Sequence, residues 1–287
     1  MPSLKDIKNR IESVKSTQQI TKAMKMVSAA KFRKAEEAIV QNRPYSDKML
    51  EVLSSLALRT EEQAHPLLER RDPKAVALVV FTSDRGLCGS FNGSILRSVE
   101  RFLREKAAQY EAVRLYLVGK KAREFFRNKS VDVIGERAEL FGKVSYGEAQ
   151  QIGREIVERY TNKELDLVYM VYNEFRSALS QQVVYDRLLP VEPLRVEPDT
   201  STTEYLYEPS EADMLNSVLP RYVDVRVFRA LLESTASEHG ARMTAMDSAT
   251  NNASDMISRL TLKYNRARQE SITKELMDIV NGVESMR

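Results

Sequence analysis

Residues 253–286 read ASDMISRLTLKYNRARQESITKELMDIVNGVESM, and their apolar side chains recur at alternating steps of four and three residues. The first run of this pattern ends at Ala267, and after a slip the second begins at Ile272. Such spacing places apolar residues along one side of an α-helix and is typical of a helix that pairs with another. The segment therefore predicts a long, partnered helix. Its apolar positions are Ala253, Ile257, Leu260, Tyr264 and Ala267, then Ile272, Leu276, Ile279, Val283 and Met286.

The helix breakers extend this prediction toward both ends of the chain. From Arg221 to Asn281 there is no proline and only one glycine, whereas Pro220 is expected to kink the helix just before this stretch. Neither breaker occurs between Pro2 and Pro44. An unbroken helix over 221–281 would be roughly 90 Å long, which is more than a compact domain of this size measures. It must therefore lie against another helix or inside a partner.

The N-terminal stretch also reads as a helix. Ser3 can cap its start, with Asp6 in the capping-box position. Apolar residues then follow at helical spacing, and after a phase slip they continue toward residue 27. The predicted apolar stripe consists of Leu4, Ile7, Ile11 and Val14, followed by Ile20, Met24 and Val27.

The middle of the chain holds eight of the ten glycines and alternates between two patterns. Runs rich in β-branched residues predict strands, and amphipathic runs between them predict helices, so we expect a mostly parallel βαβ sheet. The predicted strands are 75–82, 113–118, 131–134, 165–172 and 183–189, and the predicted helices are 93–109, 120–127 and 145–160.

Together these patterns predict an α/β fold with a long α-helical coiled coil. We expect three parts: an N-terminal helix over 1–60, a Rossmann-like domain over 74–195 and a C-terminal helix over 209–287. Both helices leave the inserted domain, so they should run antiparallel, with paired residue numbers adding to about 270. Met24 would then lie near Met246, and residues after about 268 would have no partner within the chain. Because that end is apolar on most sides, another protein should enclose it.

The composition excludes several classes of protein. The 287 residues include one Cys and two His, which excludes a disulfide within the chain, an iron–sulfur cluster and a structural zinc site. No run of about 18 apolar residues is present, so no membrane span is expected, and the N-terminus has no signal-peptide core. Residues 1–43 hold ten Lys or Arg against four Asp or Glu. This basic segment suits a polyanionic partner or a solvated helix face.

The stretch TSDRGLCGSFN at 82–92 follows the first predicted strand and opens a helix, where a phosphate-binding loop would sit. Its glycines are spaced G-x-x-G and no P-loop lysine follows, so a tight turn explains the stretch better. Cys88 is a candidate nucleophile if Arg85 lowers its pKa, but it would need a base, and only His65 and His239 are available. The pair Glu238-His239 lacks a second metal ligand in register.

Four blocks in the chain resemble the γ subunit of F-type ATP synthase. They are ITKAMKMVSAAK at 20–31, TSDRGLCGSFN at 82–92, ARMTAMDSATNNASDMI at 241–257 and YNRARQESITKELMDIVNG at 264–282. The blocks lie in the family's order and the resemblance covers the whole chain. It implies a rotating central stalk with no catalytic site or cofactor of its own. This stalk would couple proton flow through a membrane c ring to ATP synthesis at the β subunits.

The resemblance also implies partners and contact residues. The expected partners are the α and β subunits, the ε subunit and the c ring, at the cytoplasmic face of the bacterial cell membrane, without nucleic acid and without a membrane span. A contact with β is implied for Met24, Lys25, Arg268, Gln269 and Thr273. Support of the helix pair is implied for Arg242 and Met246. The foot on the c ring is assigned to Arg43, Tyr45, Tyr205, Leu206 and Tyr207, and a position near ε to Arg85 and Cys88.

Two other hypotheses remain open from the residues alone. One is a coiled-coil adaptor that binds nucleic acid through the basic residues 1–43, although no aromatic side chains interleave there for base stacking. The other is a Rossmann-like enzyme with helical arms.

Overall fold

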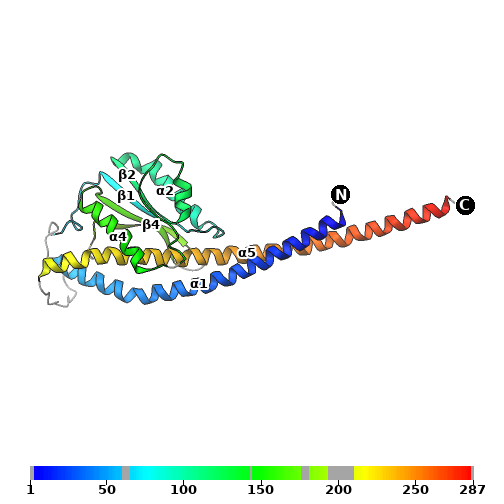
Figure 1. The fold of residues 1–287 in the computed structure, drawn as a ribbon, viewed down its shortest axis with the longest axis horizontal. Helices are drawn as coiled ribbons and strands as arrows, with labels where there is room; N and C mark the ends of the chain where they lie inside the picture. The colour runs from blue at the N-terminus through cyan, green and yellow to red at the C-terminus, as the bar shows by residue number, and fades with distance from the viewer. Residues whose placement is uncertain (1–2, 60–64, 143, 176–180, 193–209, 286–287) are drawn as a thin grey trace. The chain divides into compact units, whose positions relative to one another are not determined.

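The computed structural model describes residues 3–59, 65–142, 144–175, 181–192 and 210–285. Two long helices begin and end the chain: α1 spans Leu4–Arg59 and α5 spans Glu211–Glu284. Both continue through an internal proline, Pro44 in α1 and Pro220 in α5. Between them lies an α/β sequence of elements (Figure 1). These are β1 Ala75–Phe81, α2 Phe91–Lys106, η1 Ala107–Gln109, β2 Ala112–Val118, α3 Lys120–Phe126, β3 Asp132–Arg137, α4 Tyr146–Thr161, β4 Leu167–Phe175 and β5 Gln181–Leu189.

The chain divides into two compact units, and both long helices contribute to each. The smaller unit consists of Met1–Ser28 and Met243–Arg287, and the larger unit is Ala29–Arg242. The sequence instead predicts one part for each long helix and one for the α/β domain. Its expected limits are 1–60, 74–195 and 209–287, and they stay a prediction.

The larger unit is built on a five-stranded sheet in the order β3-β2-β1-β4-β5. The first three pairings are parallel, and only β5 is antiparallel to its neighbour β4. The central strand β1 reads AVALVVF and is buried on both faces, as expected for a parallel sheet covered by helices. The predicted α/β fold class with long helices at both ends is therefore confirmed.

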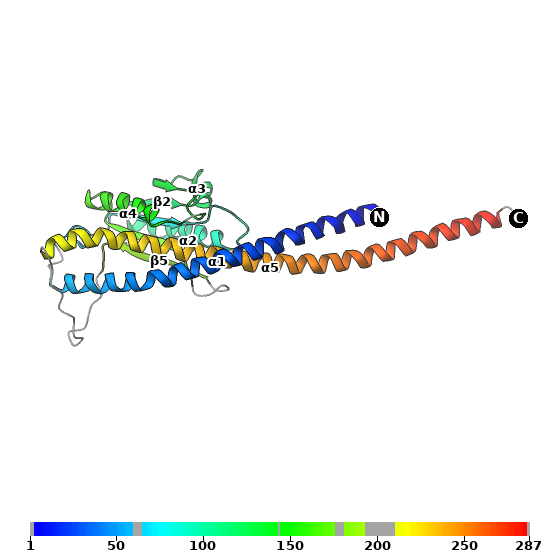
Figure 2. The same cartoon turned by 60° about the horizontal axis from the view of Figure 1, so that its bottom comes forward.

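Two hydrophobic cores lie on opposite faces of this sheet because alternate side chains of a strand point to opposite sides. Val76, Leu78 and Val80 pack against α2 and α3 on one face. Ala77, Val79 and Phe81 face the other core, where α4, α5 and the C-terminal part of α1 supply the apolar side chains. Figures 1 and 2 show α4 and α5 covering this second face. Burial on both faces holds the carboxyl ends of the parallel strands, and the loops that follow them, in place.

The smaller unit is an antiparallel pair formed by the two ends of the chain (Figure 2). Ser3 and Asp6 form the predicted capping box at the start of α1, because each backbone N–H donates to the other side chain. Figures 1 and 2 show α5 continuing past the start of α1. Among the described residues, α5 therefore extends beyond α1, as the predicted register requires.

Candidate functional site

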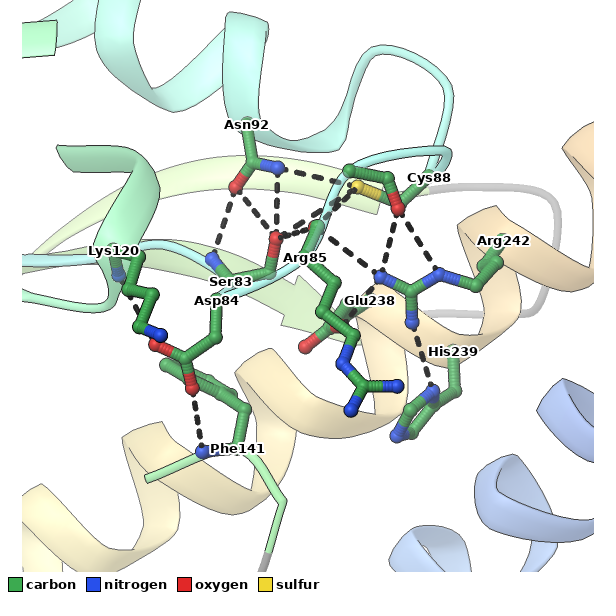
Figure 3. Close-up of polar contacts among 11 residues, drawn as sticks. Ser83, Asp84, Arg85, Cys88, Asn92, Lys120, Phe141, Glu238, His239 and Arg242 are labelled. Carbon is green, nitrogen blue, oxygen red and sulfur yellow. Dashed lines mark hydrogen bonds and ion pairs between the residues drawn. The ribbon is translucent and has the colours of Figure 1, made fainter. Parts of the chain in front are cut away.

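The loop after β1 is anchored by the carboxylate of Asp84 (Figure 3). Its Oδ1 accepts from the backbone N–H groups of Lys120, at 3.0 Å, and Glu139, at 2.9 Å, while Oδ2 accepts from Phe141 at 3.2 Å. Backbone N–H groups at the carboxyl end of a parallel sheet are the donors that hold a phosphate in nucleotide-binding folds. Here they bind the chain's own carboxylate, which supports the interpretation of 82–92 as a structural turn.

Thr82 and Gly119 close the space between β1 and β2. The Thr82 hydroxyl donates to the Val118 carbonyl, at 3.1 Å, and accepts from the Ala122 N–H, at 2.9 Å. Gly119 has a φ of +96°, and a Cβ at this position would lie 2.0 Å from the Thr82 carbonyl oxygen. Only glycine fits this approach, so the crossover from β2 to α3 is held directly against the first loop.

The thiol of Cys88 belongs to a buried hydrogen-bonded group with Ser83 and Asn92 (Figure 3). The Asn92 side-chain amide donates to the thiol sulfur, at 3.2 Å, and to the Ser83 hydroxyl, at 2.8 Å. Cys88 is 2% exposed, and its burial raises the pKa of the thiol, while Arg242 opposes that rise. The hypothesis that Arg85 activates this cysteine is therefore wrong, because burial dominates and the nearby cation is a different arginine.

Neither histidine is arranged as a base for this thiol. His65 Nδ1 accepts from the Leu67 N–H at 3.1 Å, and His239 Nδ1 lies 3.2 Å from the Arg242 guanidinium. Burial, with a contribution from Arg242, lowers the pKa of His239 to about 4, so its ring is neutral at neutral pH. In the described part of the chain, no group of three His, Cys, Asp or Glu side chains is placed to hold a metal ion.

Arg242 on α5 binds the turn at Arg85 and Gly86. Its Nε donates to the Gly86 carbonyl at 3.2 Å, and its Nη2 donates to the carbonyls of Gly86, at 3.1 Å, and Arg85, at 3.3 Å. Glu238, one helical turn earlier, pairs with Nη2 at 2.7 Å. All these contacts lie within the larger unit, and the bonds from Arg242 to Arg85 and Gly86 join the second and third resemblance blocks (Figure 3).

The Arg242–Glu238 pair is buried, with Arg242 7% and Glu238 3% exposed. Burial raises the pKa of Glu238, and the adjacent guanidinium lowers it again. Glu238 Oε2 finds no hydrogen-bond partner among the described residues. A buried pair of this kind is costly to break from one side, because the remaining charge is then uncompensated.

The turn that Arg242 binds is strained and exposed at its tip. Leu87 has a φ of +62°, in the left-handed region, and its side chain is 64% exposed. A bulky residue in that region costs about 1–3 kcal/mol and persists only where surrounding contacts impose it. Those contacts are the Arg242 guanidinium and the buried group around Cys88.

In the smaller unit, three polar pairs fix the register of the two helices. Gln18 bonds Ser254 at 2.6 Å, Thr21 lies 2.8 Å from Thr250 hydroxyl to hydroxyl, and Lys25 pairs with Asp247 at 2.6 Å. Paired residue numbers therefore add to 271 or 272, one or two more than expected from the sequence. The expected apolar stripe is wrong at Ile20 and Val27, which are both 57% exposed, because Thr21 and Ser28 take the buried positions.

The residues expected to contact β lie at two separate places on the helices. Met24 is half-buried, and Lys25 is paired with Asp247, so part of its charge is already compensated within the chain. Arg268, Gln269 and Thr273 are exposed near the end of α5, and Thr273 donates to the Gln269 carbonyl. Nothing in the chain alone tests their contact with β, which stays a prediction.

The remaining predicted positions have different surroundings. Met246 is buried at 5% exposure in the smaller unit, and Arg242 belongs to the larger unit. Tyr45 is 53% exposed and Arg43 lies within α1. The predicted foot residues Tyr205, Leu206 and Tyr207 lie outside the described residues. Arg85 is exposed at the turn beside the buried Cys88, and a position near ε stays a prediction.

Sequence reasoning missed the two carboxylates that organise this site. Asp84 directly follows the carboxyl end of a buried strand, and this position could have marked it as a possible anchor. Glu238 was considered only as a metal ligand. Its spacing of four residues from Arg242 on one predicted helix is a signal for an ion pair.

Comparison with known proteins decides the family. The family model described as ATP synthase matches residues 3–286. The chain belongs to the ATP synthase gamma chain family. It is 50% identical to the ATP synthase gamma chains of Trichlorobacter lovleyi and of Geobacter sp. strain M21, with 100% of each chain covered. The family resemblance found in the sequence is thus confirmed over its full length.

Solved structures agree with this assignment. The chain is similar to one from the Tetrahymena thermophila mitochondrial ATP synthase, in a structure of the central stalk and c-ring, with 29% identity and a TM-score of 0.60. The similarity covers 80% of this chain and 99% of the Tetrahymena one. A chain from the Euglena gracilis mitochondrial rotor shares the fold, with 21% identity and a TM-score of 0.64 over 94% of this chain and 98% of that one. The gamma chain is a central stalk subunit, and this role is favoured over the nucleic-acid-binding adaptor.

Proposed function

We propose that this gamma chain rotates within the ATP synthase and couples proton flow through the c ring to ATP synthesis on the β subunits. The main support is the end of α5. Beyond the helix pair it carries a series of apolar side chains that are at least half exposed in the chain alone. They are Ile272 at 50%, Leu276 at 58%, Met277 at 54%, Ile279 at 63% and Val280 at 54%.

A single exposed helix with this much apolar surface is unfavourable in water and suits an enclosing partner. We assign the enclosure to the α and β subunits. Burying one such side chain fully is worth about 1.5–3 kcal/mol. A partner subunit with two conformations changes their ratio from 1:99 to 99:1 when a contact stabilises one conformation by about 5.5 kcal/mol more than the other. Because these side chains are already about half buried, each gains about half of that value, so contacts of roughly four to seven of them that differ between three β subunits would hold those subunits in different conformations.

We further propose that the ε subunit and the c ring bind the larger unit, with the chain at the cytoplasmic face of the bacterial membrane. Tyr45 is exposed and available for such a contact. The similar solved structures come from a central stalk with its c-ring and from a mitochondrial rotor. This similarity supports a position of the larger unit next to the c ring. Among the described helices, none combines the length and apolar character that a membrane crossing requires.

We also propose that the gamma chain holds no catalytic site and binds no cofactor. Two observations support this. The N–H groups that would suit a phosphate are bound to Asp84, and the thiol of Cys88 is buried with a raised pKa. Nucleotide chemistry would then take place on the partner subunits, and this chain would supply only mechanical contacts.

The test is a surface variant of the α5 end in the intact complex. Ile272, Leu276 and Ile279 would be changed together to Ser, which removes exposed apolar area and keeps the helix length. The matched control changes three exposed polar residues of the same segment, Lys274, Glu275 and Asp278, to Ser. Both complexes are purified through a tag on the β subunit, and proton-driven ATP synthesis is measured in vesicles.

We expect the apolar variant to lose at least half of its ATP synthesis per assembled complex and the control to retain most of it. Truncation of residues 269–287 should abolish coupling altogether. The proposal fails if the unmodified chain does not co-purify with α and β, or if the apolar variant couples as well as the control.

A further inference from the structure

We propose that Arg242 is a positioning residue that fixes the Arg85–Gly86 turn to α5, so that force on this turn passes directly into the long helix. The inference rests on the proposed rotary function. It concerns a contact within the chain, between a loop of the α/β sheet and α5, and assigns that contact a mechanical role.

The geometry of the guanidinium carries the proposal. Three hydrogen bonds from Nε and Nη2 reach two consecutive carbonyl oxygens, those of Arg85 and Gly86. A planar fork of donors fixes the orientation of the turn as well as its distance from the helix. A lysine ammonium at the same position would supply the charge without that fixed fork.

The guanidinium is itself held by its own helix. Glu238 pairs with Nη2 at 2.7 Å, and His239 Nδ1 lies 3.2 Å from Nη1. Both partners are at most 5% exposed, so water does not compete for these bonds. Arg242 therefore cannot swing away from the turn without leaving the buried Glu238 carboxylate uncompensated.

The Arg85–Gly86 turn is also anchored to the sheet. Asp84, just before it, binds three backbone N–H groups, and Cys88, just after it, accepts from Asn92. The strained φ of Leu87 at the tip indicates that contacts on both sides impose the conformation. A force on the exposed Leu87 side chain thus acts on a loop that is fixed both to the sheet and to α5.

The position of Arg242 along the helix suits this role. It is the last residue of the larger unit, and from Met243 onward α5 belongs to the smaller unit. The contact between Arg242 and the Arg85–Gly86 turn, called the clamp below, therefore lies at the C-terminal end of the part of α5 that belongs to the larger unit.

Cys88 provides a direct readout, because it is the only cysteine in the chain and is buried beside the clamp. In the intact complex, Arg242→Gln should speed labelling of this thiol by a maleimide at least tenfold. It should also lower the number of protons pumped per ATP hydrolysed by at least half. A purely structural role would reduce the amount of complex and leave this ratio unchanged. The control is Arg229→Gln, whose guanidinium pairs with Glu233 on the same helix; it should change neither readout.

Glu238→Gln tests the same clamp with a nearly isosteric change if Arg242→Gln does not assemble; we expect at least threefold faster labelling and a lower pumping ratio. In the unmodified complex, labelling during ATP hydrolysis should be no faster than at rest. Unchanged labelling or an unchanged ratio in the clamp variants, or faster labelling of the unmodified complex during turnover, would overturn the inference. Failure of the unmodified chain to assemble would instead refute the proposed function.

Discussion

Asp224 should make the stability of the larger unit depend on pH, and its replacement by Asn should remove that dependence. The side chain lies on α5, is 6% exposed, and approaches the backbone of α4 so closely that a Cβ on Gly153 would lie 2.3 Å from its Oδ1. Burial raises the pKa of Asp224 from 3.8 to about 6, while Arg154 and a hydrogen bond with Gln150 limit the rise.

The sign of the effect follows from the two pKa values. Below the unfolded pKa of 3.8, the carboxyl is protonated in both the folded and the unfolded chain, so its burial carries no charge penalty. As the pH rises toward 6 the unfolded chain ionises first, so stability is lost, and the full loss is reached above the folded pKa. The difference between the two pKa values corresponds to about 3 kcal/mol at pH 8 and about 1.5 kcal/mol at pH 5. Asp224→Asn keeps the shape and avoids the buried charge.

The assay is urea unfolding of the purified chain between pH 5 and pH 8. Tyrosine fluorescence is the suitable probe because the chain has 12 Tyr and no Trp. Asp224→Asn should be more stable than the unmodified chain by up to about 3 kcal/mol at pH 8, and the advantage should halve at pH 5. The control Asp72→Asn removes an exposed carboxylate and should change stability by less than about 0.5 kcal/mol. Equal stability of Asp224→Asn and the unmodified chain at pH 8, or an advantage that does not vary with pH, would refute this reasoning.

Two further predictions concern the glycine crossover and the helix register. Gly119→Ala should cost more than about 3 kcal/mol in urea unfolding, because its Cβ would lie 2.0 Å from the Thr82 carbonyl at a φ of +96°. Gly142→Ala, with nothing within 4 Å, should be nearly neutral, and a similar loss in both would contradict the close approach. Thr21→Cys combined with Thr250→Cys should form a disulfide on oxidation, seen as a shift in gel mobility, because the two hydroxyls are 2.8 Å apart. The exposed Ile20→Cys with Thr250→Cys should not crosslink, and the reverse result would exclude the register.

The strands and helices of the α/β domain could be predicted closely because each has a clear periodicity. The predicted run at 75–82 is apolar up to its last residue, Thr82, and corresponds to β1, Ala75–Phe81, which is buried on both faces. The edge strand β5 also lay where its β-branched residues indicated. Its antiparallel direction was not predicted, since periodicity is the same for both directions.

The register of the helix pair was predicted only to within two residues, and the physical reason is visible in the contacts. The pairs that set it are polar: Gln18 with Ser254, Thr21 with Thr250, and Lys25 with Asp247. Apolar spacing does not identify such polar residues. It predicted Ile20 and Val27 at the helix interface, and both face solvent in the chain alone.

The candidate site was predicted by motif but not by its contacts. Arg242 binds carbonyls 156 and 157 residues earlier in the chain, and no local pattern encodes such a distance. Asp84 likewise bonds N–H groups 36 to 57 residues away. Backbone acceptors and donors exist at every position, so the sequence does not show which of them a side chain will meet.

The pairing of the two chain ends has a consequence for biosynthesis. Lys25 leaves the ribosome 222 residues before its partner Asp247. At about 5–20 residues per second, this interval is roughly 10–45 s. During this interval residues 4–28 are exposed without the segment of α5 that packs against them. The sheet can fold before that segment has been synthesised. The first helix to be made is thus among the last to be completed, and nascent chains of this length should be prominent clients of ribosome-associated chaperones.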